Sequence, residues 1–579
     1  MLEYREFNAP LLVHAVTPSG PIPTICDPEG LYPYESFVET SRRPQLQSHR
    51  FIVLENERLR VTICPDLGGK VYSLYDKVAG HEVLFVPASI KPVRILPRLG
   101  FIPGGIEVSF PIAHTPVQLE PVAAVIHRAG DRLYAWCGER ELRFGLQWTV
   151  EWSLGENDSF LTQRTCFANP TGSPHPWMSW SNAALPARAD TQFHFPDGQV
   201  LRHGERLEQI DWATQGPRTV AGVHSMTGFF WLRPGVCAFG AFTPSLGHGL
   251  FHVAEAAAAP GIKLWTYGHG ADERWGQAAS LSGETYIEIQ GGPQADQSIK
   301  DTLAPGERRH HVEFWFPTAA PLELDELRLP TPELLPVDQA PAFDWPPRES
   351  VRRWVCVLEA HRARLAERLP PPPGIDENHW APSGMDDLGE ALGWAASVNS
   401  SGSSDTWLFH LGAWQAARNE VETALATLAR STDERARLLA GRLHLRVRQD
   451  PAAAVHALRA IRVEALTLHP QVMIERDLAL AALGPATLAE RAAWLERLLR
   501  CTDEWLLERR AAWLADAGRL DEARELLERT PFQLVHQRYE RTRLWRDLQR
   551  ASATPGSTPP ASLGEDNLAA FGAYRDFAG

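Results

Sequence analysis

The spacing of the hydrophobic residues changes once along the chain, and this change constrains the fold more than any other feature. From about residue 47 to 317, apolar and polar residues alternate in short runs such as HRFIVLEN, LQWTVEWSL and HHVEFWFP, which Gly, Pro, Asp and Asn separate. A period of two is typical of β-strands, and so long a stretch without helical interruption favours a large sandwich of two curved sheets. We therefore expect the first half of the chain to be all-β.

Beyond about residue 349 the period becomes 3.6, as in an α-helix. The segment SVRRWVCVLEAHRARLAERL places Val351, Val355, Leu358 and Leu365 on one helical face. From Trp407 onward the chain reads as helix pairs joined by short polar turns, and the pair ERRAAWLADAGRLDEARELLERTPF resembles the tetratricopeptide pattern of small residues at helix contacts. We expect helical hairpins that cap the β-domain or form a dimer contact, with a peptide-binding groove as the alternative.

The length of 579 residues exceeds what one hydrophobic core supports, so several domains are expected. The Pro-rich PPPPG and the later SVNSSGSSD indicate a linker between the two halves. The expected units are an N-terminal extension packing on the β-domain (1–45), the β-domain itself (46–320), a helix and linker (321–405), a tetratricopeptide-like helical domain (406–550) and a C-terminal tail (551–579).

The charge of the chain argues against two classes of partner. The 57 Lys and Arg against 71 Asp and Glu give a formal net charge of −14, which repels phosphate backbones and anionic lipid surfaces. The sequence has no run of 18 apolar residues, and its first residues lack the pattern of a signal peptide. We therefore expect a cytoplasmic protein that binds neither nucleic acid nor membranes.

The familiar cofactor and metal motifs are absent from the sequence. The seven cysteines lie far apart without a CxxC pair, so neither a zinc cluster nor a disulfide framework is expected. Walker, G-x-G-x-x-G, G-x-S-x-G and H-E-x-x-H motifs do not occur either. No cofactor is expected, although a single divalent cation held by scattered carboxylates and carbonyls leaves no sequence pattern.

Several polar residues stand inside apolar or glycine-rich β segments, as in a ligand site built on a sheet. In GFIPGGIEVSFPIAHTP, Gly104 and Gly105 permit a backbone conformation or a close approach that larger residues block. Glu107 and His114 follow, and either can be a solvated or structural side chain instead of a site residue. Lys70, after two glycines, is a weaker candidate for the same pocket.

Tryptophans accompany the second and third polar segments. In PHPWMSWSNAALP, Trp180 and Asn182 share one side of a strand and can meet a polyol together, and Trp177 lies beside them. In KLWTYGHGADERWGQAASL, Trp265 and Trp275 flank a glycine loop that carries His269. The alternatives are core tryptophans and a surface turn without function.

The remaining tryptophans are expected to be core residues. Among the 20 tryptophans, we expect some to alternate along strands in the sandwich core and others to fill the seams between paired helices. The first group includes Trp148, Trp152 and Trp315, and the second includes Trp494, Trp505 and Trp513.

The fourth polar segment is TYIEIQGG, in which Glu288 and Gln290 lie on the same face of a strand. Two hydrogen-bonding side chains in this arrangement can hold a pair of hydroxyl groups, or Glu288 can act as a base.

These segments together resemble a known family. LGGKVYSLYDK, GGIEVSFPIAHTP, WSNAALP, KLWTYG and YIEIQGG, in this order and followed by tetratricopeptide-like helices, closely resemble the bacterial family called domain of unknown function 5107 over about residues 20–320. The resemblance implies a galactose mutarotase-like β-supersandwich, a fold shared by sugar epimerases, glycoside hydrolase and phosphorylase domains, and polysaccharide lyases.

The resemblance also implies roles for particular residues. Aldose epimerases carry a general-base glutamate in a Glu-x-Gln pattern on a late strand, and Glu288 and Gln290 match that pattern. Their central strand carries an Asn-His pair whose histidine is the acid, whereas this sequence has Asn182 followed by Ala183. Epimerase activity therefore requires His114 or His269 to replace that acid.

The leading functional prediction is a glycoside hydrolase that cleaves a neutral oligosaccharide or glycoside, with Glu107 and Glu288 as its two carboxylates. Carboxyl groups about 5–5.5 Å apart would indicate a retaining mechanism, and about 6.5–9.5 Å an inverting one. The alternatives are an aldose epimerase or other sugar isomerase, and a sugar sensor that binds a protein partner or a second copy through its helical repeats; a polysaccharide lyase is a weaker fourth. The expected sugar-binding residues are Lys70, His114, Trp177, Trp180, Asn182, Trp265, His269, Trp275 and Gln290.

Overall fold

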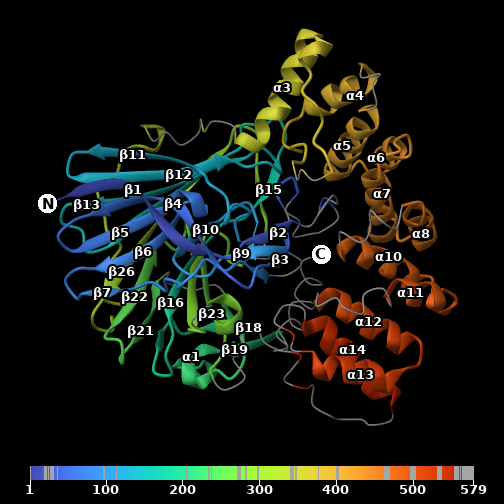
Figure 1. Cartoon of the computed structure of the whole chain (residues 1–579). Coiled ribbons are helices and arrows are strands. Elements are labelled where there is room, and N and C mark those ends of the chain that lie inside the picture. Colours follow the sequence, from blue (N-terminus) through green and yellow to red (C-terminus); the bar gives the residue numbers. More distant parts are fainter. Residues whose placement is uncertain are drawn as a thin grey trace.

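Two large antiparallel sheets face each other in the first half of the protein, as the computed structural model in Figure 1 shows. The structure describes residues 2–563 apart from 19–22, 24, 26–31, 36, 96–97, 113, 204–206, 233–234, 236–237, 270–274, 281–282, 297–298, 340–344, 346–347, 376, 378, 399–402, 462–469, 496–503, 531, 533–537, 553–559 and 561–562. Within these residues the larger sheet has 12 strands and the smaller one has 8.

The larger sheet is built mainly from the first and third quarters of the β half. Its strands, in spatial order, are β1 (Glu3–Val13), β4 (Gln45–Glu55), β5 (Leu59–Cys64), β6 (Lys70–Asp76), β10 (Ile106–Ser109), β16 (Trp180–Pro186), β24 (Tyr286–Gly292), β23 (Gly261–Thr266), β20 (Thr227–Trp231), β18 (Gln199–His203) and β19 (Leu207–Asp211), with β7 (His81–Glu82) beside β6.

The smaller sheet covers one face of the larger one. Its strands, in spatial order, are β11 (Ala123–Ala129), β12 (Arg132–Arg140), β13 (Gln147–Gly155), β14 (Leu161–Ala168), β26 (Arg308–Thr318), β22 (His248–Ala254), β21 (Ala238–Thr243) and β17 (Gln192–His194). Three strand pairs and two short helices complete the β half: β2 (Val16–Pro18) with β3 (Phe37–Thr40), β8 (Val93–Ile95) with β9 (Arg98–Phe101), β15 (His175–Trp177) with β25 (Asp301–Leu303), α1 (Trp212–Gln215) and α2 (Trp275–Ala279).

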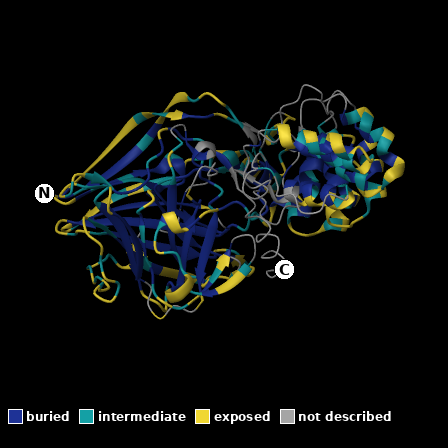
Figure 2. Ribbon diagram, turned by 90° about the horizontal axis from the view of Figure 1, so that it is seen from below, coloured by how far each residue is buried: buried dark blue, intermediate teal, exposed yellow. Residues whose placement is uncertain are grey.

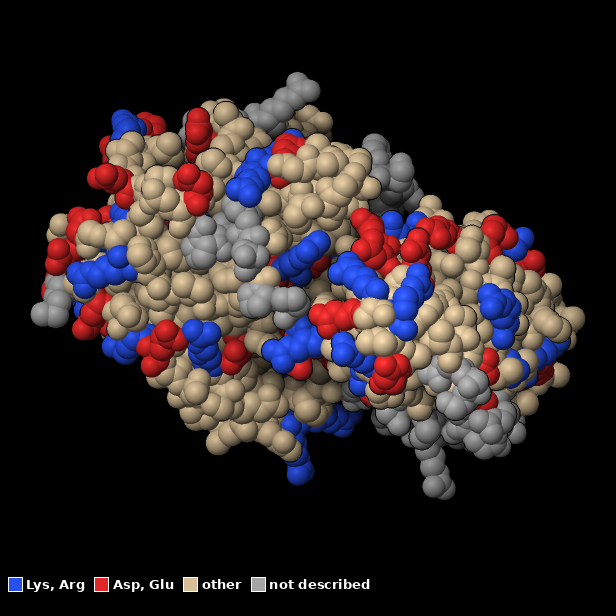
Figure 3. All heavy atoms as spheres, turned by 90° about the horizontal axis from the view of Figure 1, so that it is seen from above, with Lys and Arg blue, Asp and Glu red and all other residues tan. Residues whose placement is uncertain are grey.

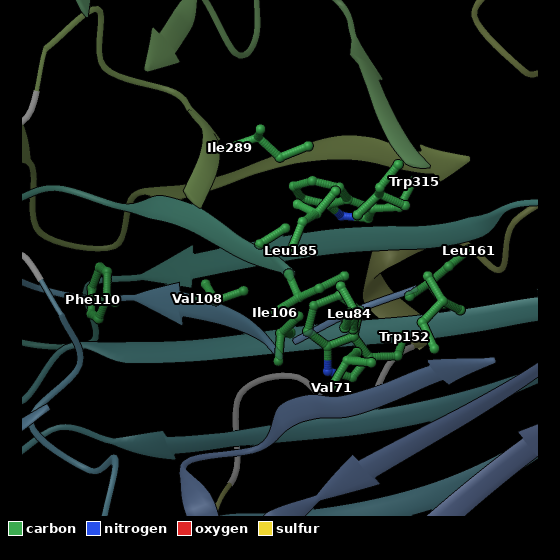
Figure 4. Packing of buried hydrophobic residues seen from close by; sticks show 14 of the residues in the cluster. Val71, Leu84, Ile106, Val108, Phe110, Trp152, Leu161, Leu185, Ile289 and Trp315 are labelled. Atoms are coloured by element: carbon green, nitrogen blue, oxygen red, sulfur yellow. The ribbon is translucent and has the colours of Figure 1, made fainter. Parts of the chain in front are cut away.

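The main hydrophobic core lies between the two sheets. Trp148, Trp152 and Trp315 are completely buried in it, which confirms the expected core role of these strand tryptophans. In Figure 4, Trp152 of the smaller sheet packs close to Val71 and Ile106 of the larger one. Burial of one such large apolar side chain stabilises a fold by about 1.5–3 kcal/mol, so this layer positions the strands of both sheets.

The N-terminal segment, expected as an extension that packs on the β-domain, contributes β1 to the larger sheet. β1 pairs with β4 along its whole length, from Glu3 opposite Glu55 to Val13 opposite Gln45. Most side chains of β1, which lies at one edge of the sheet, are exposed on both faces. Its sequence therefore lacks the alternation that reveals a strand with one buried face.

The second half of the chain is a series of helical hairpins that extends to one side of the β-domain (Figure 1). Its helices are α3 (Glu349–Ala363), α4 (Leu388–Val398), α5 (Ser404–Ala417), α6 (Val421–Leu428), α7 (Glu434–Arg446), α8 (Pro451–Arg459), α10 (Pro470–Ala482), α11 (Leu488–Leu495), α12 (Glu504–Asp516), α13 (Leu520–Arg529) and α14 (Arg538–Ala551).

The helical domain begins earlier in the sequence than expected. Trp354 of α3, Leu388 of α4 and Trp407 of α5 share one hydrophobic cluster, so α3 and α4 belong to the helical domain and not to a linker. Trp513 is buried between helices and Trp494 packs against two neighbouring helical clusters, as expected for seam residues. The side chain of Trp505 and almost all of the expected tail lie outside the described residues.

Two tyrosines of the N-terminal segment connect the β-domain with the helices. Tyr32 packs in a helical cluster and donates a hydrogen bond to the carbonyl of Ala381 (2.7 Å), whereas Tyr34 packs in the main β core and donates to Glu139 (2.8 Å). Arg348, just before α3, also donates to Glu139 (2.7 Å). These contacts join the two halves firmly.

Burial follows this division into two packed parts. Buried residues fill the interior of the β-domain and the inner faces of the helices, and exposed residues cover the outside (Figure 2). On the face seen in Figure 3, acidic and basic side chains are interspersed, and basic ones gather near the boundary between the two parts. Among the described helices, none combines the length and the hydrophobicity that a membrane-spanning segment needs.

Candidate functional site

Side chains from five neighbouring strands form a polar row across the larger sheet, consisting of Lys70, Glu107, Asn182, Gln290 and Lys263. The pairing register places Glu107 of β10 opposite Asn182 of β16, and Asn182 opposite Gln290 of β24. Lys263 of β23 continues the row beyond Gln290. Lys70 of β6 extends it on the other side, next to Glu107.

The polar row lies on the face of the sheet that points away from the second sheet. Ile106, Ala183 and Ile289 are the sequence neighbours of row residues, and their side chains belong to the core between the sheets. Because successive side chains of a strand point to opposite faces, the row points outward. Each row residue is nevertheless at most 5 % exposed, so other parts of the protein cover it.

Glu107 is held as a carboxylate by donors from the segment that follows β10. His114 Nδ1 lies 2.9 Å from Oε2, and the backbone N–H of Thr115 (2.7 Å) and the hydroxyl of Ser109 (3.2 Å) donate to Oε1. Burial alone would raise the pKa of Glu107, but His114, Lys70 and the Thr115 N–H together lower this pKa to about 2. Glu107 is therefore ionised near neutral pH.

His114 occupies the place beside Asn182. Its Nδ1 lies 3.3 Å from the amide nitrogen of Asn182, and its backbone has a φ of 55°, an uncommon value for a residue with a side chain. The side chain of Ala183 points into the core, so a histidine at that position would face away from the row. The loop therefore places His114 beside Asn182, and its use as a replacement for the acid of the epimerases stays a prediction.

Glu288 lies two residues before Gln290 on β24 and has a different environment from Glu107. The hydroxyl of Tyr267 donates to its Oε1 (3.0 Å), and the amide of Gln290 donates to its Oε2 (2.8 Å). Burial raises the pKa of Glu288, although the charges of His114 and Lys263 and the Tyr267 hydrogen bond oppose this effect. Glu288 therefore holds its proton more readily than Glu107 does.

The register also sets the spacing of the two glutamates. β10 and β24 are separated by one strand, and Glu288 is two residues out of step with Glu107. The usual spacing between strands and the usual rise per residue thus place their α carbons about 12 Å from each other. The expected assignment of a retaining or inverting outcome stays a prediction.

Two buried lysines stand at the ends of the polar row. Lys70 donates to the carbonyl of Ile102 (3.1 Å), and Lys263 Nζ lies 4.9 Å from the ring of Phe230 and 5.0 Å from that of Trp265. Burial lowers the pKa of each lysine to about 8, although Glu107 and Glu288 oppose this for Lys70, and Glu288 and Asp296 for Lys263. Both remain largely charged at neutral pH and offset the carboxylates.

An aromatic cluster packs beside Glu288. The ring of Trp275 stacks on that of Tyr267 with centroids 4.7 Å apart, and Tyr286 stacks on Phe85 at 4.8 Å. Phe101 lies near Trp275 and also contacts His114. This cluster is separate from the main core and forms an apolar wall of the site.

The structure brings most of the expected site residues together. Glu107, His114, Asn182, Glu288, Gln290 and Lys70 meet around the polar row, Trp265 lies opposite Glu288 on the neighbouring strand, and Trp275 belongs to the aromatic cluster. Gln290 orients Glu288 directly, in addition to any role as a hydroxyl-binding residue.

Three expected binding residues have other surroundings. Trp177 packs against Phe110 and Phe167 in the main core instead of the site. Trp180 shares the outer face with Asn182 as expected but is completely buried, with Gly292 packed against its ring. His269 is exposed, and the loop beyond it, 270–274, lies outside the described residues.

The sequence reasoning missed four contributors to the site. Lys263 stands two residues before Trp265, and the alternation of side chains along a strand predicts that both point to the same face. Tyr267 follows the same strand, beyond the last paired residue, where alternation no longer indicates direction. Ser109 and Thr115 act on Glu107, and Thr115 does so through its backbone, which leaves no side-chain pattern to read.

The described residues contain no group of three or more His, Cys, Asp or Glu side chains arranged to hold a metal ion. Two buried carboxyl groups, Glu107 in the polar row and Glu288 beside it, are the main ionisable groups of the site together with His114 and the two lysines. The protein is thus of a class that combines a two-sheet β-domain, which carries a covered polar row, with a following domain of helical hairpins.

The chain belongs to the family called domain of unknown function 5107, whose model matches residues 26–318. A second family model, described as a C-terminal domain, matches residues 354–548, which agrees with a helical domain that begins at α3. A TPR-domain containing protein from Parabacteroides distasonis, known from a crystal structure, is 46 % identical over 98 % of both chains, with a TM-score of 0.93. The predicted family and the predicted order of β-sandwich and tetratricopeptide-like helices are both confirmed.

Weaker matches cover about half of the chain. A galactose mutarotase-like protein from Clostridium acetobutylicum is 12 % identical over 47 % of this chain and 95 % of its own, with a TM-score of 0.37. A galactose mutarotase-like protein from Lactobacillus casei is 12 % identical over 46 % of this chain and 100 % of its own, with a TM-score of 0.35. Similarity at this level carries no information on activity.

Proposed function

We propose that the polar row binds a neutral sugar and that Glu107 and Glu288 hydrolyse a glycosidic bond of it. The observation that carries this proposal is that the surroundings shift the pKa values of two buried carboxyl groups of one site in opposite directions. Glu107 accepts several hydrogen bonds and stays a carboxylate, whereas burial favours the protonated form of Glu288. Pairs of titratable groups driven apart in this way divide the acid and base roles between them.

The roles then follow from the chemistry of glycoside cleavage. Glu288 donates its proton to the oxygen of the leaving group, and Glu107 supplies the negative charge that attacks the anomeric carbon or activates water. After direct attack, water cleaves the bond between Glu107 and the sugar and gives its proton to Glu288. When Glu107 instead activates water, the hydroxyl of the water adds to the anomeric carbon, its proton passes to Glu107, and exchange with solvent restores both carboxyl groups. Tyr267 and Gln290 hold the two oxygens of Glu288 in place.

Burial supports a small substrate. Lys70 interacts with the charge of Glu107, and Lys263 with that of Glu288 when this group is ionised. Because every residue of the polar row is at most 5 % exposed, a long polymer has no open surface along which to lie. We therefore propose short glycosides or the ends of oligosaccharides as substrates.

Incubation of the protein with a panel of neutral oligosaccharides and aryl glycosides tests this function. Glu107→Gln and Glu288→Gln should each reduce hydrolysis by about 10²–10⁴-fold, because each removes one acid–base group. Glu208→Gln is the matched control, since Glu208 forms an exposed ion pair with Arg202 on β18 and β19. Unchanged hydrolysis in both site variants would contradict the proposed pair.

The position of His114 supports a second candidate, an aldose epimerase. His114 lies beside Asn182 and is backed by the carboxylate of Glu107, and its charge acts on Glu288. An acid and a base at one sugar ring are what mutarotation needs. Polarimetry on free aldoses distinguishes the two candidates: if the protein is an epimerase, the wild type should accelerate anomer interconversion and His114→Gln should return it to the uncatalysed rate, whereas a hydrolase should leave it at the uncatalysed rate.

A further inference from the structure

Three aromatic side chains form a chain of hydrogen bonds that ends on Glu288. Trp275 Nε1 donates to the hydroxyl of Tyr286 (2.8 Å), Tyr286 donates to the hydroxyl of Tyr267 (3.1 Å), and Tyr267 donates to Glu288 Oε1 (3.0 Å). We call this arrangement the aromatic relay. All four side chains are at most 4 % exposed.

The direction of the aromatic relay follows from the chemistry of its members. An indole N–H only donates, so the hydroxyl of Tyr286 must accept from Trp275 and has its single hydrogen left for Tyr267. The hydroxyl of Tyr267 accepts that bond and directs its own hydrogen to Glu288. Every donor of the relay therefore points toward the carboxyl group, and bonds aligned in one direction strengthen one another.

Ring packing fixes the aromatic relay in this geometry. The rings of Tyr267 and Trp275 are parallel within 3° at 4.7 Å, and Tyr286 packs between Tyr267 (4.8 Å) and Phe85 (4.8 Å). Tyr286 stands two residues before Glu288 on β24, so the strand itself holds these two side chains on one face. The hydroxyl of Tyr267 thus has little freedom to turn away from Glu288.

We propose that Tyr267 is the positioning residue of Glu288. Its hydroxyl fixes one carboxyl oxygen, while Gln290 fixes the other, and it stabilises the carboxylate that remains when Glu288 gives up its proton. Trp275 and Tyr286 in turn fix the Tyr267 hydroxyl. This inference rests on the proposed function in one respect only, namely that Glu288 donates its proton to a substrate.

The charged groups around Glu288 act together with the aromatic relay. His114 from the loop after β10 and Lys263 from β23 favour the carboxylate, and Glu107 from β10 opposes it. Lys70 of β6 also interacts with Glu288. None of these groups changes when a tyrosine hydroxyl is removed, so variants of the relay isolate its contribution.

Infrared titration of the full-length protein tests the relay without a substrate. The protonated-carboxyl band of Glu288 is identified by its loss in Glu288→Gln, and its midpoint is then followed with pH in Tyr267→Phe. Because a hydrogen bond to the charged form favours ionisation, its removal should raise the Glu288 midpoint by about one to two pH units. An unchanged or lowered midpoint in Tyr267→Phe overturns the proposal.

Variants further along the aromatic relay provide a graded second test. Tyr286→Phe keeps its ring and Trp275→Phe replaces the indole with a smaller aromatic ring; each removes one donor, so they should raise the same midpoint by less, in this order. Tyr75→Phe is the matched control, because Tyr75 lies on β6 under Arg60. If Tyr267→Phe fails to fold, the two outer variants decide alone, and the absence of a shift in both overturns the relay.

The titration separates this inference from the proposed function. A raised midpoint without any glycoside cleavage in the wild type supports the aromatic relay and contradicts the hydrolase. When cleavage is observed, the alkaline limb of the kcat/KM profile should move to higher pH in Tyr267→Phe together with the midpoint. A side chain that only fills space would move neither.

Discussion

Glu107 and Glu288 are the same residue type on the same face of one sheet, and their surroundings give them opposite properties. His114 and the backbone of the loop after β10 supply Glu107 with donors, whereas Glu288 faces an aromatic wall. Burial is similar for both side chains, so the number and charge of the donors decide which carboxyl keeps its proton.

Replacement of the two glutamates should therefore affect stability in opposite directions. The lowered pKa of Glu107 contributes stability above pH 4.5, the ordinary value for a glutamate, which is lost as the pH falls toward 2. Glu107→Gln should lower the free energy of unfolding at pH 7 by about 3 kcal/mol, and this difference from the wild type should shrink on acidification. Denaturant unfolding at a series of pH values measures it.

Glu288→Gln should instead raise stability at neutral pH, because it removes a carboxylate whose ionisation burial disfavours. The raised pKa means that the stability contribution of Glu288 is largest at low pH and falls as the pH rises. Thermal unfolding at pH 5 and pH 8 should thus show a larger gain at pH 8. A loss of stability at pH 8 would contradict this environment.

The site depends on how three short elements meet: β6, β10 and the loop that follows β10. Gly105, just before β10, has a φ of 72°, and a Cβ there would lie 2.2 Å from the carbonyl oxygen of Val71 on β6. The sequence indicated either an unusual backbone or a close ligand approach at this position. The structure shows the unusual backbone together with a close approach of the neighbouring strand.

Gly105→Ala should destabilise the protein strongly by separating β10 from β6. Gly80→Ala is the matched control, because Gly80 has nearly the same φ, 75°, and no described atom lies within 4 Å of the position that an added Cβ would take. The control should lose about 1–2 kcal/mol from backbone strain alone, and Gly105→Ala about 1–3 kcal/mol more from the steric contact. Calorimetry of both variants compares them; equal losses would show that the strand contact is unimportant.

A buried charge ties the site-bearing strands to the second sheet. Glu313 of β26 accepts hydrogen bonds from Ser181 of β16 (2.6 Å), Gln163 of β14 (2.7 Å) and His252 of β22 (3.0 Å), and it is completely buried. Ser181 precedes Asn182, so this group supports the polar row from the core side.

Glu313→Ala should lower the free energy of unfolding by about 3–5 kcal/mol, because it leaves buried donors without their acceptor. Glu307→Ala on the same chain segment is a suitable control, since Glu307 is more exposed and pairs with Arg309. Denaturant titration measures both losses. Similar small losses in the two variants would contradict a structural role for the buried carboxylate.

At the scale of the whole molecule, the junction between the β-domain and the helices is built from charged and aromatic contacts. Arg348 lies just before α3, the first helix of the helical domain, and pairs with Glu120 and Glu139 of the β-domain. Tyr32 and Tyr34 anchor the N-terminal segment in the two neighbouring cores. Because these groups are largely buried, the junction should resist separation of the domains.

Arg348→Met should weaken this junction, since loss of one partner of a buried ion pair costs about 3–5 kcal/mol. Limited proteolysis should then cleave the segment 319–348 faster than in the wild type. Arg352→Met is the matched control, because Arg352 pairs only with Glu349 among the described contacts and both are exposed; it should change stability by less than about 1 kcal/mol. Equal cleavage rates in the two variants would contradict the role of Arg348.

The two-part organisation and the strand faces of single residues could be predicted from the sequence, because the hydrophobic period is a local property of neighbouring residues. It indicated Glu107, His114, Asn182, Glu288 and Gln290 as site residues, since each stands in an apolar or glycine-rich strand segment or beside one. The same local pattern also selected Trp177, which packs in the core, because alternation does not reveal which face of a strand is covered.

Which of these residues contact one another depends on how the strands pair in the folded protein. Glu107 and Asn182 are 75 positions apart and touch because β10 pairs with β16 in one register, and a shift of one residue would turn every row side chain into the core. The aromatic relay has the same origin: Tyr267, Trp275 and Tyr286 come from a strand end, a short helix and a strand. Pairing between distant segments depends on the packing of the whole sheet, and no local pattern contains that information.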